Sequence, residues 1–229
     1  MTEISWFRIE NKDLDFQFYR KNPHIPSGGW IVLLIAMLFG MILMGSSRIY
    51  IVIPSTVVII VPVLYFLKWD YKAIFQKPSL RDVGLAVALF VGYMAYSIVM
   101  GLILNQYGIF GGTLVEPSTI SIWSFFPMIF SLMTEEFLKF IPFMFFMRLI
   151  YKYSENRKSA VIISMIITMI FFAALHAYNW EMLKFALCIQ GFGSIFEFIG
   201  YIKTKNILIP YITHLCTDFF IYMVIILGL

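Results

Sequence analysis

Long runs of apolar residues, separated by short polar stretches, fill most of this chain. The runs cover residues 30–45, 49–67, 83–104, 119–150, 159–176, 182–202 and 207–229. Most are long enough to cross the roughly 30 Å hydrocarbon layer of a bilayer as a helix. The runs do not alternate as membrane β-strands do, and helices satisfy their own backbone polar groups in lipid. The pattern predicts an all-α, polytopic helical membrane protein with about seven transmembrane helices.

Composition supports this prediction. The 229 residues are 61% hydrophobic and only 13% charged, which is too few charges to cover the surface of a soluble domain. We expect one domain, in which residues 1–29 form a polar cytoplasmic segment and residues 30–118 the first membrane helices. The net charge of +4 is spread over short loops, which fits an anionic membrane face rather than a nucleic acid. Neither Cys188 nor Cys216 indicates a disulfide, because both lie in apolar runs.

The distribution of basic residues predicts the orientation. Cytoplasmic loops of membrane proteins carry an excess of Lys and Arg. With the N-terminus inside, 14 of the 17 basic residues fall in inner segments, within residues 1–29, 68–81, 148–158 and 203–205. Arg48 and Lys184 fall outside, and Lys139 falls within a run. Seven helices with the N-terminus inside and the C-terminus outside satisfy the bias.

The fourth run is too long for one upright helix. Its 32 residues would extend for about 48 Å at 1.5 Å per residue. Pro127 and Pro142 offer points where the helix can bend. We expect a kinked and tilted helix. The alternative is a short re-entrant piece over residues 119–131, which would raise the number of membrane elements to eight.

Five ionisable side chains lie inside the apolar runs, and they call for an explanation. They are Glu135, Glu136, His176, His214 and Asp218. A charged side chain at the centre of a bilayer costs about 2.5–3.5 kcal/mol on insertion scales. Because this cost recurs five times in one short chain, we expect the residues to have a function.

Spacing groups these residues but leaves simpler interpretations open. Glu135 and Lys139 are four residues apart and share a helix face, so they can form an internal ion pair. Glu136 points about 100° away, towards another neighbour. His214 and Asp218 are also four apart, so the carboxylate can orient the imidazole. His176 lies near the end of its run and can be an ordinary interfacial residue.

The sixth run carries a polar stripe. Gln190, Ser194, Glu197 and Tyr201 follow one another at steps of four, three and four residues. Glycines in the same run allow helices to approach closely. Glu197 can line a cavity or pair with Lys203, and a structural role is the interpretation that we favour for it.

Other catalytic motifs are absent from the sequence. It contains no HExxH, no GxSxG, no Gly-rich phosphate loop and no pair of cysteines at metal-binding spacing. Chemistry that uses a serine or cysteine nucleophile therefore has little support.

Three motifs in order resemble one family. The segments EEFLK (135–139), FAALH (172–176) and HLCTD (214–218) look like the motifs of the CPBP family, the CAAX-protease and bacteriocin-processing (Abi) group of intramembrane glutamic endopeptidases. The approach to the last motif, GYIKTKNILIPYITHLCTDFF, is similar as well. The resemblance covers about residues 119–222, so it implies a catalytic core over 119–229. Residues 1–118 resemble only generic membrane helices.

The first motif departs from the family pattern. EExxxR would place Arg at position 140, where this chain has Phe140, and the nearest cation is Lys139. EExxK is the first motif of the related PrsW-type proteases. Their second motif ends in Glu, whereas this chain has His176. The third motif fits both groups, and the histidine favours the CPBP family.

The resemblance implies a mechanism and its residues. Glu135 and His176 would activate a water molecule, since water needs a general base to attack a peptide bond. His214 and Asp218 would face the developing oxyanion. Glu136 would have a positional role and pair with Lys139 or Arg148, so Glu136 and Lys139 are supporting residues. The family implies no metal and no cofactor, although two histidines and carboxylates could also ligate zinc.

The implied site requires residues at different depths to meet. Counted along straight helices, Glu135 and His176 lie about 22 Å and 25 Å from the inner ends of their runs, and His214 only about 11 Å. We therefore predict that the turn over residues 203–206 is submerged. The expected substrate is a membrane-associated peptide or protein, and the expected location is a prokaryotic plasma membrane.

Two other classes of function remain open. The polar residues could form the proton relay of a transporter, although we detect no inverted repeat of the kind common in transporters. The chain could also be a catalytically inactive scaffold, an immunity protein or a regulatory protein related to the protease family.

Overall fold

A computed structural model describes residues 16–18, 25–44, 48–110 and 120–228. The long helices are α1 (Ser27–Met44), α2 (Ile49–Phe66), α3 (Leu80–Gln106), α4 (Phe125–Ser154), α5 (Arg157–Leu175) and α8 (Leu208–Leu227). Between α5 and α8 lie α6 (Trp180–Ala186), a π-helix (Leu187–Gly191) and α7 (Ile195–Thr204). Short 3₁₀ helices cover Tyr71–Ala73 and Ile122–Ser124. The all-α fold class is confirmed.

Six of the seven expected spans are long and apolar enough to cross a membrane. One of them is the continuous segment Trp180–Thr204, which contains α6, the π-helix and α7. The seventh expected span is α4, whose 30 residues include five charged side chains. In the described part of the chain, α4 starts at Phe125 and runs unbroken past Pro142. The alternative prediction of a separate re-entrant piece over residues 119–131 is therefore wrong.

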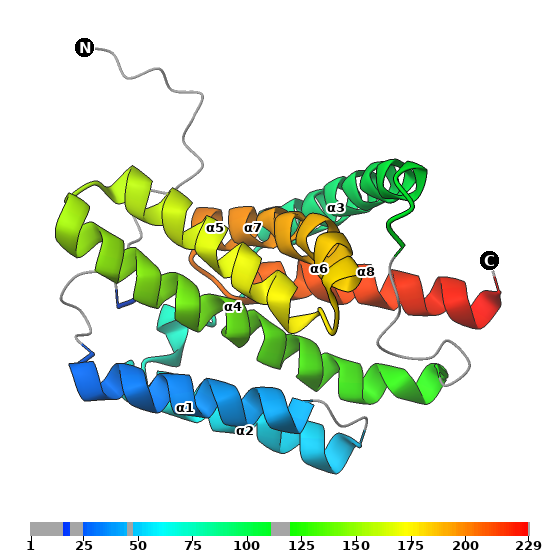
Figure 1. The fold of residues 1–229 in the computed structure, drawn as a ribbon. Helices are drawn as coiled ribbons and strands as arrows, with labels where there is room; N and C mark the ends of the chain where they lie inside the picture. Colours follow the sequence, from blue (N-terminus) through cyan, green and yellow to red (C-terminus); the bar gives the residue numbers. More distant parts are fainter. Residues whose placement is uncertain (1–15, 19–24, 45–47, 111–119, 229) are drawn as a thin grey trace.

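Helix α4 is the centre of the bundle. It packs against α1 and α2 on one side and against α5 and α8 on others, while α3 packs against α7 and α8. Figure 1 shows the start of α1 and the turn between α4 and α5 at one end of the bundle, and the start of α4 and the end of α8 at the other. This alternation agrees with the predicted orientation, which stays a prediction.

Local signals fix several helix ends. Ser79 and Asp82 form a reciprocal capping box at the start of α3. Asn156 caps α5 by accepting a hydrogen bond from the backbone amide of Ser159. Asn179 does the same for α6 at Met182. Such caps satisfy amides that the first turn of a helix leaves without a partner.

Hydroxyl groups tie α2 to α4 near the middle of both helices. Thr134 lies 2.9 Å from Thr56 and 3.1 Å from Ser55 between side-chain oxygens. The Thr56 hydroxyl also donates to the backbone carbonyl of Phe130 at 2.9 Å. Side-chain hydrogen bonds between membrane helices are worth about 0.6 kcal/mol on average. This cluster fixes the rotation of α4 one residue before Glu135.

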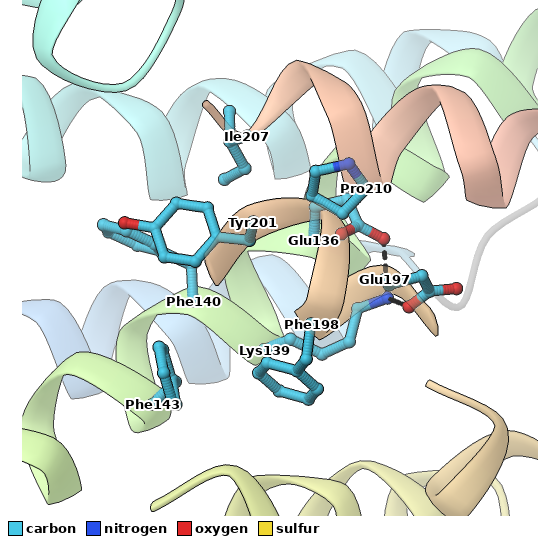
Figure 2. A pocket seen from close by; sticks show the side chains of 9 residues that line it. All are labelled: Glu136, Lys139, Phe140, Phe143, Glu197, Phe198, Tyr201, Ile207 and Pro210. Atoms are coloured by element: carbon cyan, nitrogen blue, oxygen red, sulfur yellow. Dashed lines mark hydrogen bonds and ion pairs between the residues drawn. The ribbon is translucent and has the colours of Figure 1, made fainter. Parts of the chain in front are cut away.

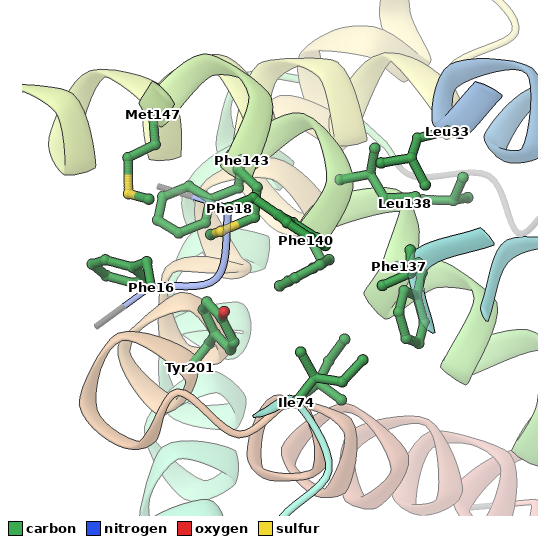
Figure 3. Packing of buried hydrophobic residues seen from close by; sticks show 14 of the residues in the cluster. Phe16, Phe18, Leu33, Ile74, Phe137, Leu138, Phe140, Phe143, Met147 and Tyr201 are labelled. Atoms are coloured by element: carbon green, nitrogen blue, oxygen red, sulfur yellow. The ribbon is translucent and has the colours of Figure 1, made fainter. Parts of the chain in front are cut away.

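Residues 16–18 are buried among the helices. Phe16 packs against Phe143 and Tyr201, and Phe18 packs against Trp30 and Phe140 (Figure 3). Between them, Gln17 donates to the carbonyl of Ala73 and accepts from the Tyr201 hydroxyl. Part of the segment that we expected to be polar and cytoplasmic thus belongs to the hydrophobic core. The division into residues 1–29, 30–118 and 119–229 stays a prediction.

The turn between α7 and α8 is buried. Lys205 has no exposed surface and Asn206 is only 3% exposed. The Asn206 side chain donates to the carbonyl of Gln76 at 2.8 Å and accepts from the amide of Leu208 at 3.1 Å. The turn is thus enclosed by protein, as its expected submersion requires, and its depth in a bilayer stays a prediction. Cys188 and Cys216 are free and half-buried.

Candidate active site

The four residues expected to be catalytic lie together. Glu135 comes from α4, His176 is the C-terminal cap of α5, and His214 and Asp218 lie one turn apart on α8. Glu135 Oε2 is 3.9 Å from His176 Nε2 and 3.8 Å from His214 Nε2. His214 Nε2 is also 3.9 Å from Asp218 Oδ1. These gaps exceed a direct hydrogen bond and are of the size that a bridging water can span.

The backbone of α5 fixes the His176 ring. His176 Nδ1 lies 2.9 Å from the carbonyl oxygen of Phe172 one turn earlier. A carbonyl can only accept, so Nδ1 carries the proton of this bond. The ring also packs edge-on against Phe172, with centroids 4.6 Å apart. Nε2 therefore faces Glu135, with a lone pair when the ring is neutral.

Glu136 fixes the His214 ring in the same way. His214 Nδ1 lies 2.8 Å from Glu136 Oε1. The same carboxylate is paired with Lys139 at 2.6 Å, so it accepts and Nδ1 donates. Nε2 of His214 then points to Glu135 and Asp218. The two neighbouring glutamates on α4 thus contact opposite sides of the imidazole: Glu136 binds Nδ1, and Glu135 faces Nε2.

Burial divides the site into an open and a closed part. The side chains of Glu135, His176 and Asp218 are 15%, 19% and 31% exposed. Those of Glu136 and Lys139 are only 3% and 4% exposed. The open part can receive water and a substrate, while the closed part is shielded by the surrounding helices.

Lys139 does not have the partner that spacing suggested. Its ammonium group pairs with Glu136 and, across the bundle, with Glu197 on α7 (Figure 2). The pairing of Lys139 with Glu135, which their spacing allowed, is therefore wrong, whereas the pairing with Glu136, which the resemblance implied, is present. Of the two roles suggested for Glu197, it lines a cavity, and its carboxylate pairs with Lys139 rather than with Lys203.

Glu197 is the charged residue that sequence reasoning left outside the site. Its Oε1 lies 3.8 Å from His214 Nδ1, and its Oε2 accepts from Lys139. The polar stripe along the sixth run was the available signal. It did not identify the partner, because Lys139 is 58 residues away in sequence.

A small cavity lies beside the closed part. Its volume is about 20 Å³, which is enough for one water molecule. Figure 2 shows its lining, which comes from α4, α7 and the start of α8. The lining residues are Glu136, Lys139, Phe140, Phe143, Glu197, Phe198, Tyr201, Ile207 and Pro210.

Three side chains around the Lys139 ammonium have the spacing of metal ligands. Glu136, Glu197 and His214 each offer one ligand atom, and these atoms lie within 4.8 Å of one another. The Lys139 ammonium bonds both carboxylates and lies 3.5 Å from His214 Nδ1. A metal ion would have to displace this ammonium, so the lysine takes the place of a cation here.

These features define a polytopic helical membrane protein with a partly open cluster of glutamate, histidine and aspartate. Residues 117–220 match the model of the type II CAAX prenyl endopeptidase Rce1-like family. That stretch contains all six residues that the sequence analysis placed in the site, and the match supports the predicted assignment to the CPBP family. No curated protein and no solved structure matches the chain.

Proposed function

We propose that this protein is an intramembrane endopeptidase that hydrolyses peptide bonds with a water molecule activated by Glu135 and His176. The observation that carries the proposal is the meeting of Glu135, His176, His214 and Asp218 from three helices at gaps of 3.8–3.9 Å. The family match supports proteolysis as the reaction.

The gap between Glu135 and His176 suits the attacking water. One hydrogen of that water can point to Glu135 Oε2 and the other to the lone pair of His176 Nε2, which are 3.9 Å apart. The water oxygen then attacks the substrate carbonyl carbon, and Glu135 takes the proton as general base. When the C–N bond breaks, the protonated Glu135 returns this proton to the leaving amine.

The α8 residues suit the stabilisation of the oxyanion. His214 Nε2 faces the same space as Glu135, and in its doubly protonated form it can donate to the carbonyl oxygen that becomes negative. Asp218 lies beside Nε2. It either orients the ring or, when protonated, donates the second hydrogen bond.

The partial exposure of the site suits a substrate that arrives within the membrane. We propose a membrane-associated peptide or protein as the substrate, in line with the family's activity on CAAX prenyl proteins. The prokaryotic plasma membrane is the proposed location.

The test is the isosteric change Glu135→Gln, which removes the base and keeps the shape. Purified protein in liposomes is incubated with peptides ending in C-a-a-X, with and without a prenyl group, and the products are identified by mass spectrometry. Loss of the general base is expected to slow cleavage about 10²–10⁴-fold. The matched control is Glu155→Gln, because Glu155 lies exposed in the turn between α4 and α5.

Equal cleavage by wild type and Glu135→Gln would contradict the proposal. If wild type cleaves none of the peptides and Glu135→Gln preserves the phenotype of the cell, the scaffold interpretation is favoured. Proton flux in liposomes that Asp218→Asn abolishes would instead favour the transporter.

A further inference from the structure

Lys139 occupies the meeting point of four helices. Its ammonium group, which comes from α4, bonds Glu136 on the same helix and Glu197 on α7. It also lies 4.7 Å from the ring centroid of Phe172 on α5 and 3.5 Å from His214 Nδ1 on α8. An ammonium enclosed in this way is stable in a buried site only with carboxylates beside it.

The contacts form one chain of groups that ends at His214. Glu136 Oε1 accepts both from Lys139 at 2.6 Å and from His214 Nδ1 at 2.8 Å. The strength of the ion pair between Glu136 and Lys139 therefore affects the hydrogen bond that Glu136 accepts from His214 Nδ1. Glu197 also binds the Lys139 ammonium and so weakens the ion pair between Lys139 and Glu136. A change at Glu197 is thereby transmitted through Lys139 and Glu136 to the ring.

The family motif explains why such an arrangement is needed in this chain. Where the motif has Arg, this chain has Phe140, which packs against Phe18, Phe137 and Tyr201. Position 140 therefore serves the hydrophobic core, and the cation comes from the preceding residue. A lysine presents a compact charge rather than a planar fork, so its direction depends on its partners.

We propose that Glu197 is a positioning residue of the active site, which holds the Lys139 ammonium so that Glu136 keeps its hydrogen bond from His214 Nδ1 and Nε2 of the ring stays directed at Glu135 and Asp218. This inference rests on the proposed function for its kinetic consequence. Its structural consequence, the hydrogen bond from His214 Nδ1 to Glu136, can be measured whether or not the protein is a protease.

The first measurement is the ring ¹⁵N NMR spectrum of protein labelled at histidine. The chain has only three histidines, His24, His176 and His214, so substituting each one assigns its signals. In wild type, Nδ1 of His214 is expected to carry the proton. In Glu197→Gln, the Nδ1 signal is expected to shift from its wild-type position, because the hydrogen bond from Nδ1 to Glu136 changes. An unchanged His214 spectrum would overturn the proposal.

The second measurement separates positioning from stability. In Glu197→Gln, kcat is expected to fall about 100-fold with KM nearly unchanged, because a misplacement of about 1 Å can cost that much. Glu197→Asp, which keeps the charge, is expected to recover part of kcat. A lower melting temperature with wild-type kcat would mean that Glu197 only stabilises the fold, and would overturn the proposal.

The matched control is Glu181→Gln. Glu181 and Lys184 also form a Glu–Lys pair at 2.7 Å, but their side chains are 63% and 41% exposed. An exposed pair contributes little, so neither the His214 spectrum nor kcat is expected to change. If the protein proves to have no protease activity, the proposed function fails, while the NMR result still decides the role of Glu197.

Discussion

Gly191, the last residue of the π-helix, lies where a side chain has no room. A Cβ atom at this position would lie 2.9 Å from Ala173 Cβ and 2.9 Å from the Met169 carbonyl oxygen on α5. Both distances are shorter than real Cβ contacts in packed cores. The second contact is with a backbone oxygen, which cannot move away as a flexible side chain can. Because α5 ends at His176, the close approach at Gly191 also sets the position of the active site.

Gly191→Ala is therefore expected to lower the stability by about 1–3 kcal/mol, as overpacking does, and to reduce activity by shifting α5. Thermal unfolding in detergent and the cleavage assay measure both effects. The control is Gly84→Ala on α3, where no atom lies within 4 Å of the added Cβ. A helical glycine of this kind gains about 0.5–1 kcal/mol when it becomes alanine. Equal melting temperatures of the two variants would contradict the packing argument.

The ionisable residues of the site were easier to predict than the pairs that they form. Glu135, His176, His214 and Asp218 stood out in the sequence because ionisable groups are costly in apolar runs. The partner of Lys139 did not, because Glu135 at four residues and Glu136 at three are both within reach on a helix. Glu197 reaches the ammonium from α7, whose aromatic side chains Phe198 and Tyr201 pack against α4.

At the scale of elements, the N-terminal stretch of residues 16–18 differs most from expectation. Its neighbours in sequence are polar and charged, so hydropathy alone assigned the region to the cytoplasm. Hydropathy averaged over many residues does not detect two single buried aromatic side chains, Phe16 and Phe18. Phe16 and Phe18 pack against Phe140, Phe143 and Tyr201. These three residues also line the cavity beside Glu136.

The double substitution Phe16→Ala and Phe18→Ala is expected to destabilise the protein strongly. Removing a buried phenylalanine side chain costs about 3–5 kcal/mol in well-packed cores, and both rings are almost fully buried. The measurement is the unfolding midpoint in detergent. The control is Phe39→Ala on α1, where the ring is 57% exposed. An unchanged midpoint in the double variant would show that this stretch does not hold the helices together.

The helices themselves were predictable because long apolar runs in lipid have few alternatives. Six expected spans correspond to helices within a few residues at each end. The break within the sixth span was not predictable, because a π-helix over Leu187–Gly191 leaves the average hydropathy unchanged. Helix α4 is the opposite case, since its charges mark it as the helix that other helices must surround.

At the scale of the whole molecule, the basic residues predict which end of the bundle faces the cytoplasm. The turn between α4 and α5 lies at the same end as the start of α1 (Figure 1), and α5 begins there with Arg157 and Lys158. Single cysteines are introduced at Lys158 and at Tyr107 in a chain without Cys188 and Cys216. In intact cells, an impermeant thiol reagent is expected to label position 107 and to spare position 158.

Disrupted cells provide the control for this experiment, because both positions should then react. Labelling of position 158 alone in intact cells would reverse the orientation. Labelling of both positions in intact cells would show that they lie on the same side of the membrane and that α4 does not cross it.

The pairing of Lys139 with Glu197 also has a consequence for biogenesis. Ribosomes add about 5–20 residues per second, so α4 waits about 3–12 s for a carboxylate that is encoded 58 residues later. During this delay the counter-charges within reach of its ammonium on the same helix are Glu135 and Glu136. Helix α4 can leave the translocon for lipid at full stability only together with α7, so the C-terminal helices enter the membrane as one assembling unit.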